Sequence, residues 1–295
     1  MKVFILGGTG SIGTPLVPAF VNRGHDVVSL ARSDDSEKVL RDRGSAVVRG
    51  DIRDPHSWAT EAVKADVILQ VAGTFTEDED AVDLGILEAL AGAAKKAGTR
   101  PKLLYTGGCW LYGETGDHVA NEDDGYNSID AFAWVIDNYR YAMKTERMDI
   151  VMIHPAMVYS EEGGVLDRFI SSAQDKGRVE IWGDPATRWP VVHSVDLASA
   201  YLLAAEQGRH GDVFNVSAED GVRVSDMADA FGKKFRLTDP PVSRPAEQLV
   251  AEYGSWAVGP TIDQQMGAFL IRNKLVWNPR YTDVIDFIAR TRWAE

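Results

Sequence analysis

The chain begins with a short apolar segment, Lys2–Leu6 (KVFIL), followed at once by Gly7-Gly8-Thr9-Gly10-Ser11-Ile12-Gly13 and then by a largely apolar stretch at residues 14–22. The first segment predicts a buried strand, and the stretch after the glycines predicts a helix. Glycines at this spacing allow a tight turn, close approach of a pyrophosphate, and close packing of helix on strand. The helix N-terminus adds free N–H groups. We therefore expect a dinucleotide site formed by Gly7, Gly10, Ser11, Ile12 and Gly13.

The first half of the chain repeats this order of strand and helix. Further strands are predicted at 26–30, 46–49, 67–71, 102–105 and 150–153, with helices at 36–43, 55–63, 80–97 and 128–146 between them. Alternation of this kind is typical of a parallel sheet covered by helices on both faces. The predicted fold class is therefore α/β, a doubly wound parallel sheet of the Rossmann type with a smaller C-terminal substrate-binding portion.

The end of the second predicted strand selects between the two nicotinamide dinucleotides. A carboxylate at this point would bond the ribose 2′-hydroxyl and repel a 2′-phosphate. The sequence here is Ser29-Leu30-Ala31-Arg32-Ser33, with no carboxylate before Asp34. Because the guanidinium of Arg32 is a planar donor that suits a phosphate, NADP(H) is favoured over NAD(H).

Beyond Pro155 the alternation stops, and the segment to residue 190 predicts loops. A helix at 195–206 and a strand at 213–216 then return to the first pattern. We therefore expect residues 1–155 plus about 190–216 to form the NADP-binding Rossmann domain. The substrate-binding portion is expected at about 156–189 plus 217–295.

Composition excludes several classes of protein. The 31 Lys and Arg residues against 44 Asp and Glu give a net charge of −13, which argues against nucleic-acid and membrane partners. The single cysteine indicates a reducing compartment. No segment has the roughly 18–20 apolar residues of a membrane span, and the first apolar segment lacks a cleavage pattern. A cytoplasmic protein that binds a small-molecule substrate is expected.

Several motifs resemble those of extended or atypical short-chain dehydrogenases/reductases, of the NAD(P)-dependent epimerase/dehydratase type. Besides the glycine loop, they are Gly50-Asp51-Ile52, Val71-Ala72-Gly73, Leu111-Tyr112-Gly113, His154-Pro155-Ala156-Met157-Val158-Tyr159 and Val192-His193-Ser194-Val195-Asp196-Leu197-Ala198. The resemblance covers about residues 1–216. It implies cofactor contacts from Asp51, Ile52, Val71, Ala72, Gly73, Thr106, His154, Pro155 and Met157.

The catalytic pattern of that family is missing. Its carbonyl-reducing members use a Tyr and a Lys four residues later on one helix, where the ammonium lowers the pKa of the tyrosine. No Tyr-x-x-x-Lys occurs in this chain, and Gly108 stands at the family's serine position. Tyr126 is the tyrosine nearest the family's catalytic position. We therefore predict Tyr126, Thr106 or an ordered water as the proton donor.

Other conspicuous residues are given structural roles. Cys109 is interpreted as a small buried hydrophobe, and the acidic run 77–83 as a solvated loop and helix start. Tyr112 is expected mainly to support the fold. The histidine spacing predicts no metal site. A stripe with helical spacing between residues 129 and 143 is interpreted as core or as the face of a homodimer.

The predicted function is that of an NADP(H)-dependent oxidoreductase acting on a small, mostly apolar carbonyl or enone-like molecule. Tyr159, Trp182, Trp189 and Trp256 are the aromatic residues predicted to wall its pocket. A redox-neutral epimerase or isomerase that retains the cofactor remains an alternative. A non-catalytic NADP(H)-sensing protein is another, since all three usual catalytic groups are absent or displaced.

Overall fold

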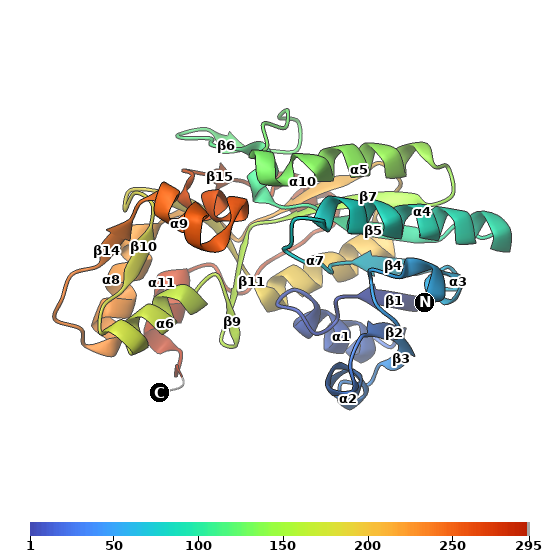
Figure 1. Cartoon of the computed structure of the whole chain (residues 1–295), viewed down its shortest axis with the longest axis horizontal. Helices are drawn as coiled ribbons and strands as arrows, with labels where there is room; N and C mark the ends of the chain where they lie inside the picture. Colours follow the sequence, from blue (N-terminus) through green and yellow to red (C-terminus); the bar gives the residue numbers. More distant parts are fainter. Residues whose placement is uncertain (294–295) are drawn as a thin grey trace. The chain divides into compact units, whose positions relative to one another are not determined.

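The computed structural model describes residues 1–293, which divide into two compact units (Figure 1). Unit 1 comprises residues 1–107, 134–154 and 197–214, and unit 2 comprises residues 108–133, 155–196 and 215 onward. Residues 108–133, which the sequence analysis placed in the nucleotide-binding domain, therefore lie in unit 2.

A seven-stranded parallel sheet with the order β12-β7-β5-β4-β1-β2-β3 forms the centre of unit 1. Its strands are β1 Lys2–Leu6, β2 Asp26–Ala31, β3 Ala46–Arg49, β4 Val67–Gln70, β5 Lys102–Thr106, β7 Asp149–Pro155 and β12 Val213–Val216. Residues Val3 to Leu6 of β1 are completely buried, because the sheet is covered on both faces. The predicted doubly wound α/β fold is confirmed.

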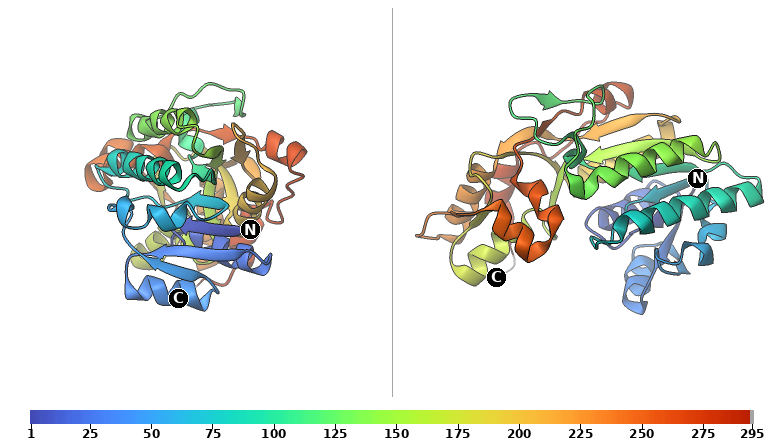
Figure 2. Two further views of the ribbon diagram at one scale, coloured as in Figure 1. Left: turned by 90° about the vertical axis from the view of Figure 1, so that its right-hand side faces the viewer. Right: turned by 45° about the horizontal axis from the view of Figure 1, so that its top comes forward.

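Helices cover both faces of this sheet. They are α1 Gly13–Asn22, α2 Asp34–Asp42, α3 Ala59–Ala62, α4 Glu79–Ala97, α5 Ala133–Lys144 and α7 Ser194–Gln207, with a short 3-10 helix η1 at Pro55–Ser57. Figure 2 shows α4 and α5 side by side on one face. Helix α4 has acidic residues in its first turn and lysines in its last, and it ends at Gly98 with φ +68°. These features complement the helix dipole and satisfy its terminal carbonyls.

The strand order of unit 1 reverses between β1 and β4. From β1 the chain proceeds outward through β2 to β3, then crosses back to β4 and continues through β5 to β7 on the other side. In open α/β sheets, ligands bind at the carboxyl ends of the strands beside such a reversal. The glycine loop follows β1 and therefore lies at this position.

Unit 2 holds three smaller sheets. A four-stranded sheet has the order β13-β11-β8-β9, and the pairs β10–β14 and β15–β6 form the other two. The strands are β6 Val119–Ala120, β8 Met157–Ser160, β9 Gly163–Gly164, β10 Glu180–Trp182, β11 Arg188–His193, β13 Glu219–Arg223, β14 Val242–Arg244 and β15 Gln265–Met266. The loops expected between 156 and 190 were wrong, because β8, β9, β10 and an intervening helix at Asp167–Lys176 lie in that interval.

The helices of unit 2 are short. They are α6 Asp167–Lys176, α8 Val224–Phe235, α9 Ala246–Tyr253, α10 Phe269–Lys274 and α11 Val284–Arg290, with 3-10 helices η2 Cys109–Tyr112, η3 Asp130–Phe132 and η4 Ser255–Thr261. In the part of the chain that the structure describes, no helix has the length and apolar character needed to cross a membrane.

Candidate active site

The glycine loop, residues 7–13, connects β1 to α1. The φ angle of Gly7 is +87°, and a Cβ there would lie 2.8 Å from the backbone of Ala72. A Cβ on Gly13 would lie 2.0 Å from the carbonyl oxygen of Gly7. At Gly10 the nearest atom to such a Cβ is 3.5 Å away. The fold itself therefore requires glycine at 7 and 13, whereas Gly10 keeps one side of the loop open.

Three consecutive amide groups at the start of α1 have no backbone acceptor among the described residues. The N–H groups of Gly10 and Thr14 bond within the loop, to the carbonyls of Gly7 and Gly10. Within residues 1–293, the N–H groups of Ser11, Ile12 and Gly13 have no such partner. Free N–H groups at a helix N-terminus, next to an open glycine, suit the pyrophosphate of a nicotinamide dinucleotide. The loop therefore fits this group.

Arg32 is the first residue after β2. Its side chain is exposed and forms no ion pair within residues 1–293. The hydroxyl of Ser33 caps α2 by accepting the amide proton of Ser36 at 3.2 Å. The Asp34 carboxylate is 3.2 Å from the guanidinium of Arg49. The nearest carboxylate after β2 is therefore paired with another arginine.

The other predicted cofactor residues of unit 1 lie in the turns after β3 and β4. The Asp51 carboxylate accepts the amide proton of Arg53 at 2.9 Å. The backbone carbonyl of Asp51 accepts the indole N–H of Trp58 at 2.8 Å. Ile52 is half-buried beside it. Val71, Ala72 and Gly73 follow β4, at the edge of the sheet where the glycine loop lies.

Thr106 ends β5, and its hydroxyl is already used within unit 1. The hydroxyl donates to the carbonyl of Gln70 at 2.5 Å and lies 2.7 Å from the hydroxyl of Tyr201. Since the one proton of the Thr106 hydroxyl goes to Gln70, the buried hydroxyl of Tyr201 donates to Thr106. The proton of Thr106 is thus directed to the protein backbone in this arrangement.

Tyr126 lies in unit 2, in the loop between β6 and η3. Its ring is tilted against that of Tyr112, with centroids 5.6 Å apart. The hydroxyl of Tyr112 donates to the Asn215 side chain at 2.8 Å, and burial raises the pKa of that phenol. The helix expected from Ser128 begins two residues later, as the 3-10 turn η3. Tyr126 is therefore held by a loop and an aromatic neighbour, outside any helix.

A buried polar cluster at the start of α4 was missed by the sequence analysis. The Asp83 carboxylate accepts hydrogen bonds from Gln70 at 3.0 Å, from Asn138 at 2.9 Å, and from the Tyr105 hydroxyl. Its side chain is 7% exposed, so the expectation that the acidic run 77–83 is solvated was wrong at this residue. Burial raises the pKa of Asp83 and of Tyr105.

Four other predicted residues are deeply buried. His154 has no exposed surface, and burial lowers its pKa to about 3. Pro155 and Met157 follow it in unit 2 and are also buried. Cys109 is buried, and burial raises the pKa of its thiol to about 12. At neutral pH the imidazole and the thiol are therefore both uncharged.

The aromatic residues predicted to wall a pocket are instead packed into unit 2. Tyr159, Trp182 and Trp189 are all less than 10% exposed. The Trp189 indole donates to the carbonyl of Pro260 at 2.9 Å. Trp182 and Trp256 lie together, with ring centroids 5.9 Å apart. These four aromatic residues therefore pack in separate parts of the core of unit 2 and do not line one pocket.

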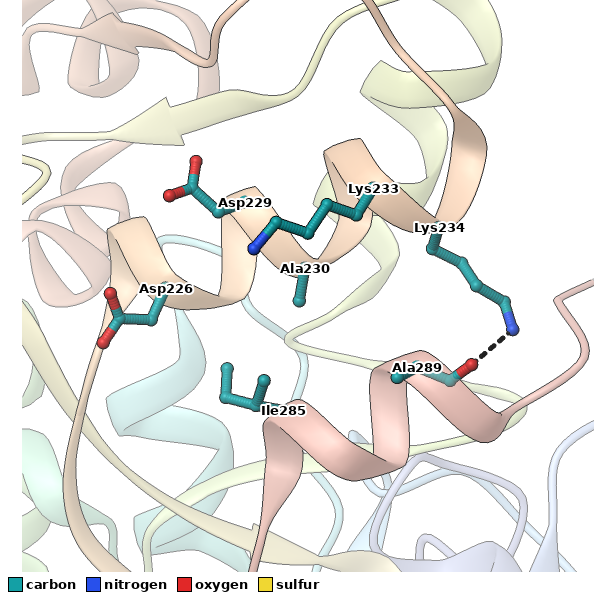
Figure 3. Close-up of a pocket in the computed structure, with 7 residues that line it drawn as sticks. All are labelled: Asp226, Asp229, Ala230, Lys233, Lys234, Ile285 and Ala289. Carbon is teal, nitrogen blue, oxygen red and sulfur yellow. Dashed lines mark hydrogen bonds between the residues drawn. The ribbon is translucent and has the colours of Figure 1, made fainter.

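One groove of unit 2 lies between α8 and α11 (Figure 3). Two aspartates and two lysines of α8 line it, and the ammonium group of Lys234 donates to the carbonyl of Ala289 at 2.7 Å. None of the predicted site residues lines this groove. Within the described residues, no three His, Cys, Asp or Glu side chains are grouped as a metal site requires.

Two relatives extend over most of the chain. The uncharacterized protein C2A9.02 of Schizosaccharomyces pombe is 24% identical over 98% of both chains. The sterol-4-alpha-carboxylate 3-dehydrogenase, decarboxylating, of Dictyostelium discoideum is 24% identical and covers 79% of this chain and 76% of its own length.

Solved structures have the same fold over nearly the whole chain. The UDP-glucose 4-epimerase of Thermotoga maritima, solved with UDP-glucose, has a TM-score of 0.81 at 18% identity, with 99% of this chain and 97% of that one covered. The human epimerase family protein SDR39U1, solved with NADPH, has a TM-score of 0.80 at 20% identity, with 99% of both chains covered. These likenesses concern the fold alone.

The family model of the NAD dependent epimerase/dehydratase family matches residues 3–217, which include the glycine loop and the whole seven-stranded sheet except its first residue. Enzymes of this family use a nicotinamide cofactor, in agreement with the open glycine loop. The expectation of an NAD(P)-dependent enzyme of the oxidoreductase or epimerase type is confirmed. The chain belongs to the NAD dependent epimerase/dehydratase family.

Proposed function

We propose that the protein is an NADP(H)-dependent oxidoreductase that acts on a small, mostly apolar carbonyl or enone-like molecule. The observation that carries the cofactor preference is the end of β2, where an exposed Arg32 is followed by a carboxylate already paired with Arg49. A 2′-phosphate would meet the unpaired guanidinium of Arg32 there, while the nearest carboxylate is already paired. A relative that is a sterol-4-alpha-carboxylate 3-dehydrogenase supports the substrate class.

In this proposal the residues of unit 1 hold the cofactor. The free amides of Ser11, Ile12 and Gly13 would bind the pyrophosphate, and Arg32 the 2′-phosphate. The bound cofactor would supply the hydride. Thr106 accepts a hydrogen bond from Tyr201, so its hydroxyl is fixed in orientation at the end of β5.

The proton would come from Tyr126. Burial and nearby acids keep its neighbour Tyr112 in the neutral form. No lysine stands four residues after Tyr126, so nothing equivalent to the family's ammonium lowers its pKa. A neutral phenol that donates a hydrogen bond is therefore the expected role.

The cofactor preference is tested by calorimetric titration of NADPH and NADH into wild type and Arg32→Ala. A charge-assisted hydrogen bond to phosphate is worth about 1.5–3 kcal/mol, so NADPH affinity should fall about 10- to 100-fold and NADH affinity should not change. Arg178→Ala removes an equally exposed arginine of unit 2 and serves as the control. Equal affinities of wild type for both cofactors would refute the preference.

The glycine loop is tested in the same titration. Gly10→Val should abolish binding of both cofactors without unfolding the protein, because the side chain would occupy the open side of the loop. Gly92→Val, in open space on α4, is the matched control. Undiminished binding by a folded Gly10→Val variant would place the cofactor elsewhere.

The proton donor is tested with Tyr126→Phe, assayed by oxidation of NADPH over a panel of apolar ketones and enones. Loss of a general acid should lower turnover about 10²- to 10⁴-fold with NADPH affinity unchanged. Tyr141→Phe, an exposed tyrosine of α5, is the control. A Tyr126→Phe variant that keeps more than about a third of wild-type turnover would exclude the role.

The same panel separates two alternatives. The fold shared with a UDP-glucose 4-epimerase favours a redox-neutral isomerase, which would convert a substrate without net consumption of NADPH. Saturable NADPH binding without conversion of any compound would favour a non-catalytic sensor.

A further inference from the structure

An arginine of unit 2 packs against two tryptophans. Arg168, on α6, has its guanidinium carbon 3.9 Å from the ring centroid of Trp182 and 5.2 Å from that of Trp256. Tyr253 stacks on Trp182, with centroids 4.8 Å apart. We call these four residues the Arg168 cluster. Its rings come from β10, α9 and η4, so three separate elements fix the position of one cation.

The guanidinium of Arg168 has a buried nitrogen, Nη1, that makes no hydrogen bond to the described residues. Burial lowers the pKa of Arg168 to about 10, so the group is still charged at neutral pH. The aromatic faces attract the cation but accept none of its in-plane N–H bonds.

The neighbouring carboxylates are engaged elsewhere. Glu180, on the same strand as Trp182, is 2.8 Å from Lys176 and 3.8 Å from Arg244. Glu252, next to Tyr253, pairs with Arg244. The Asp167 carboxylate accepts the amide proton of Gly164 at 3.2 Å. The fold thus gives each nearby acid another hydrogen-bond partner, and the Asp167 carboxylate acts on Arg168 by electrostatic attraction alone.

Burying an N–H group of a charged side chain without a hydrogen bond costs free energy. The parallel N–H groups of a guanidinium can bond two oxygens of one anion. We propose that the Arg168 cluster is a binding site for the oxyanion group, carboxylate or phosphate, of a small ligand. Trp256 is partly buried and Tyr253 is exposed, and both would pack against the ligand's apolar part. The site lies wholly within unit 2 and does not depend on the proposed cofactor or reaction.

The test is calorimetric titration of benzoate and of inorganic phosphate into wild type, Arg168→Met and Arg178→Met, with sodium chloride at equal ionic strength as reference. Arg178 follows α6, is exposed, and controls for the lost charge. Wild type and Arg178→Met should bind at least one of the two anions saturably. Arg168→Met should bind it about 10- to 100-fold more weakly, as expected for loss of a charge-assisted hydrogen bond.

The two anions distinguish the sources of the oxyanion. Binding of benzoate alone identifies a carboxylate site, binding of phosphate alone a phosphate site, and binding of both a general oxyanion site. If circular dichroism shows that Arg168→Met does not fold, Arg168→Lys takes its place. This variant keeps the positive charge but lacks the paired N–H groups of the guanidinium, so it should still bind the anion more weakly. Failure of wild type to bind either anion beyond the chloride reference, or equal binding by the folded Arg168 variant, would overturn the proposal.

Discussion

A buried carboxylate in unit 1 and a half-buried guanidinium in unit 2 have opposite surroundings. Asp83 accepts hydrogen bonds from three side chains on β4, β5 and α5. Arg168 packs against the rings of Trp182 and Trp256, and its buried Nη1 atom has no acceptor within residues 1–293. The hydrogen-bonding capacity of the first group is satisfied by the fold itself. The second has unfilled bonding capacity, which is what distinguishes a candidate ligand site from a structural centre.

The largest expected loss of stability is that of a variant at Asp83. In Asp83→Leu the side chains of Gln70, Asn138 and Tyr105 keep their donors but lose their common acceptor. Each buried unsatisfied donor costs about 1–3 kcal/mol, so we expect the free energy of unfolding to fall by about 3–5 kcal/mol after partial relaxation. Urea unfolding measures this.

Glu88→Leu is the control for Asp83→Leu. Glu88 lies on the same helix with an exposed side chain, and its replacement should change stability by no more than about 0.5 kcal/mol. Similar losses in both variants would mean that the carboxylate of Asp83 contributes nothing special. Asp83 could then no longer be contrasted with Arg168 as a group that stabilises the fold.

A smaller effect is expected in the pH dependence of stability. Burial raises the pKa of Asp83 in the folded state, so folding favours the protonated form. This contribution is fully present below the ordinary Asp pKa of about 4 and is lost as the pH rises through the raised value. Asp83→Asn cannot titrate. The advantage of wild type over Asp83→Asn should therefore shrink as the pH rises above about 4.

The measurement is urea unfolding of both proteins from acid to neutral pH. Using the difference between them cancels the acids that do not interact with Asp83. Glu79 also has a raised pKa, mainly through burial and in part through the charge of Asp83, so its response belongs to the measured difference. Tyr105 stays neutral throughout this range because its pKa is raised well above the usual value. A wild-type advantage that grows with pH would mean that Asp83 is held ionised.

The sequence predicted the sheet of unit 1 because its signals are local. Apolar runs such as Val67–Gln70 and the glycine spacing at 7, 10 and 13 need no knowledge of distant residues. Asp83 was missed because it ends an acidic run, although helical spacing places it on one face with Ile86, Leu87 and Leu90. That periodicity could have revealed the burial, but its partners Gln70 and Asn138 could not be identified from the sequence.

Unit 2 was less predictable because its contacts are distant along the chain. Strand β8 pairs with β11, while β13 completes the other side of β11. Short strands of this kind carry little periodic signal. Arg168 gave no signal of its own either, since only the fold brings Trp182 and Trp256 beside its guanidinium.

The smallest expected effect is on the stability of Arg168→Met. Loss of the cation–π contacts should cost about 0.5–2 kcal/mol, but removal of a buried N–H group without a partner offsets part of this. We therefore expect a net change below about 1 kcal/mol by urea unfolding. Arg188→Met provides the contrast within unit 2, because the Arg188 guanidinium bonds the carboxylates of Asp263 and Asp117 at 2.5 and 2.9 Å. Losing these bonds at a partly exposed site should cost more, about 1–2 kcal/mol. An Arg168→Met variant that is destabilised more than Arg188→Met would show that the contacts of Arg168 with Trp182 and Trp256 support the fold. Arg168 and Asp83 would then differ less than their surroundings indicate.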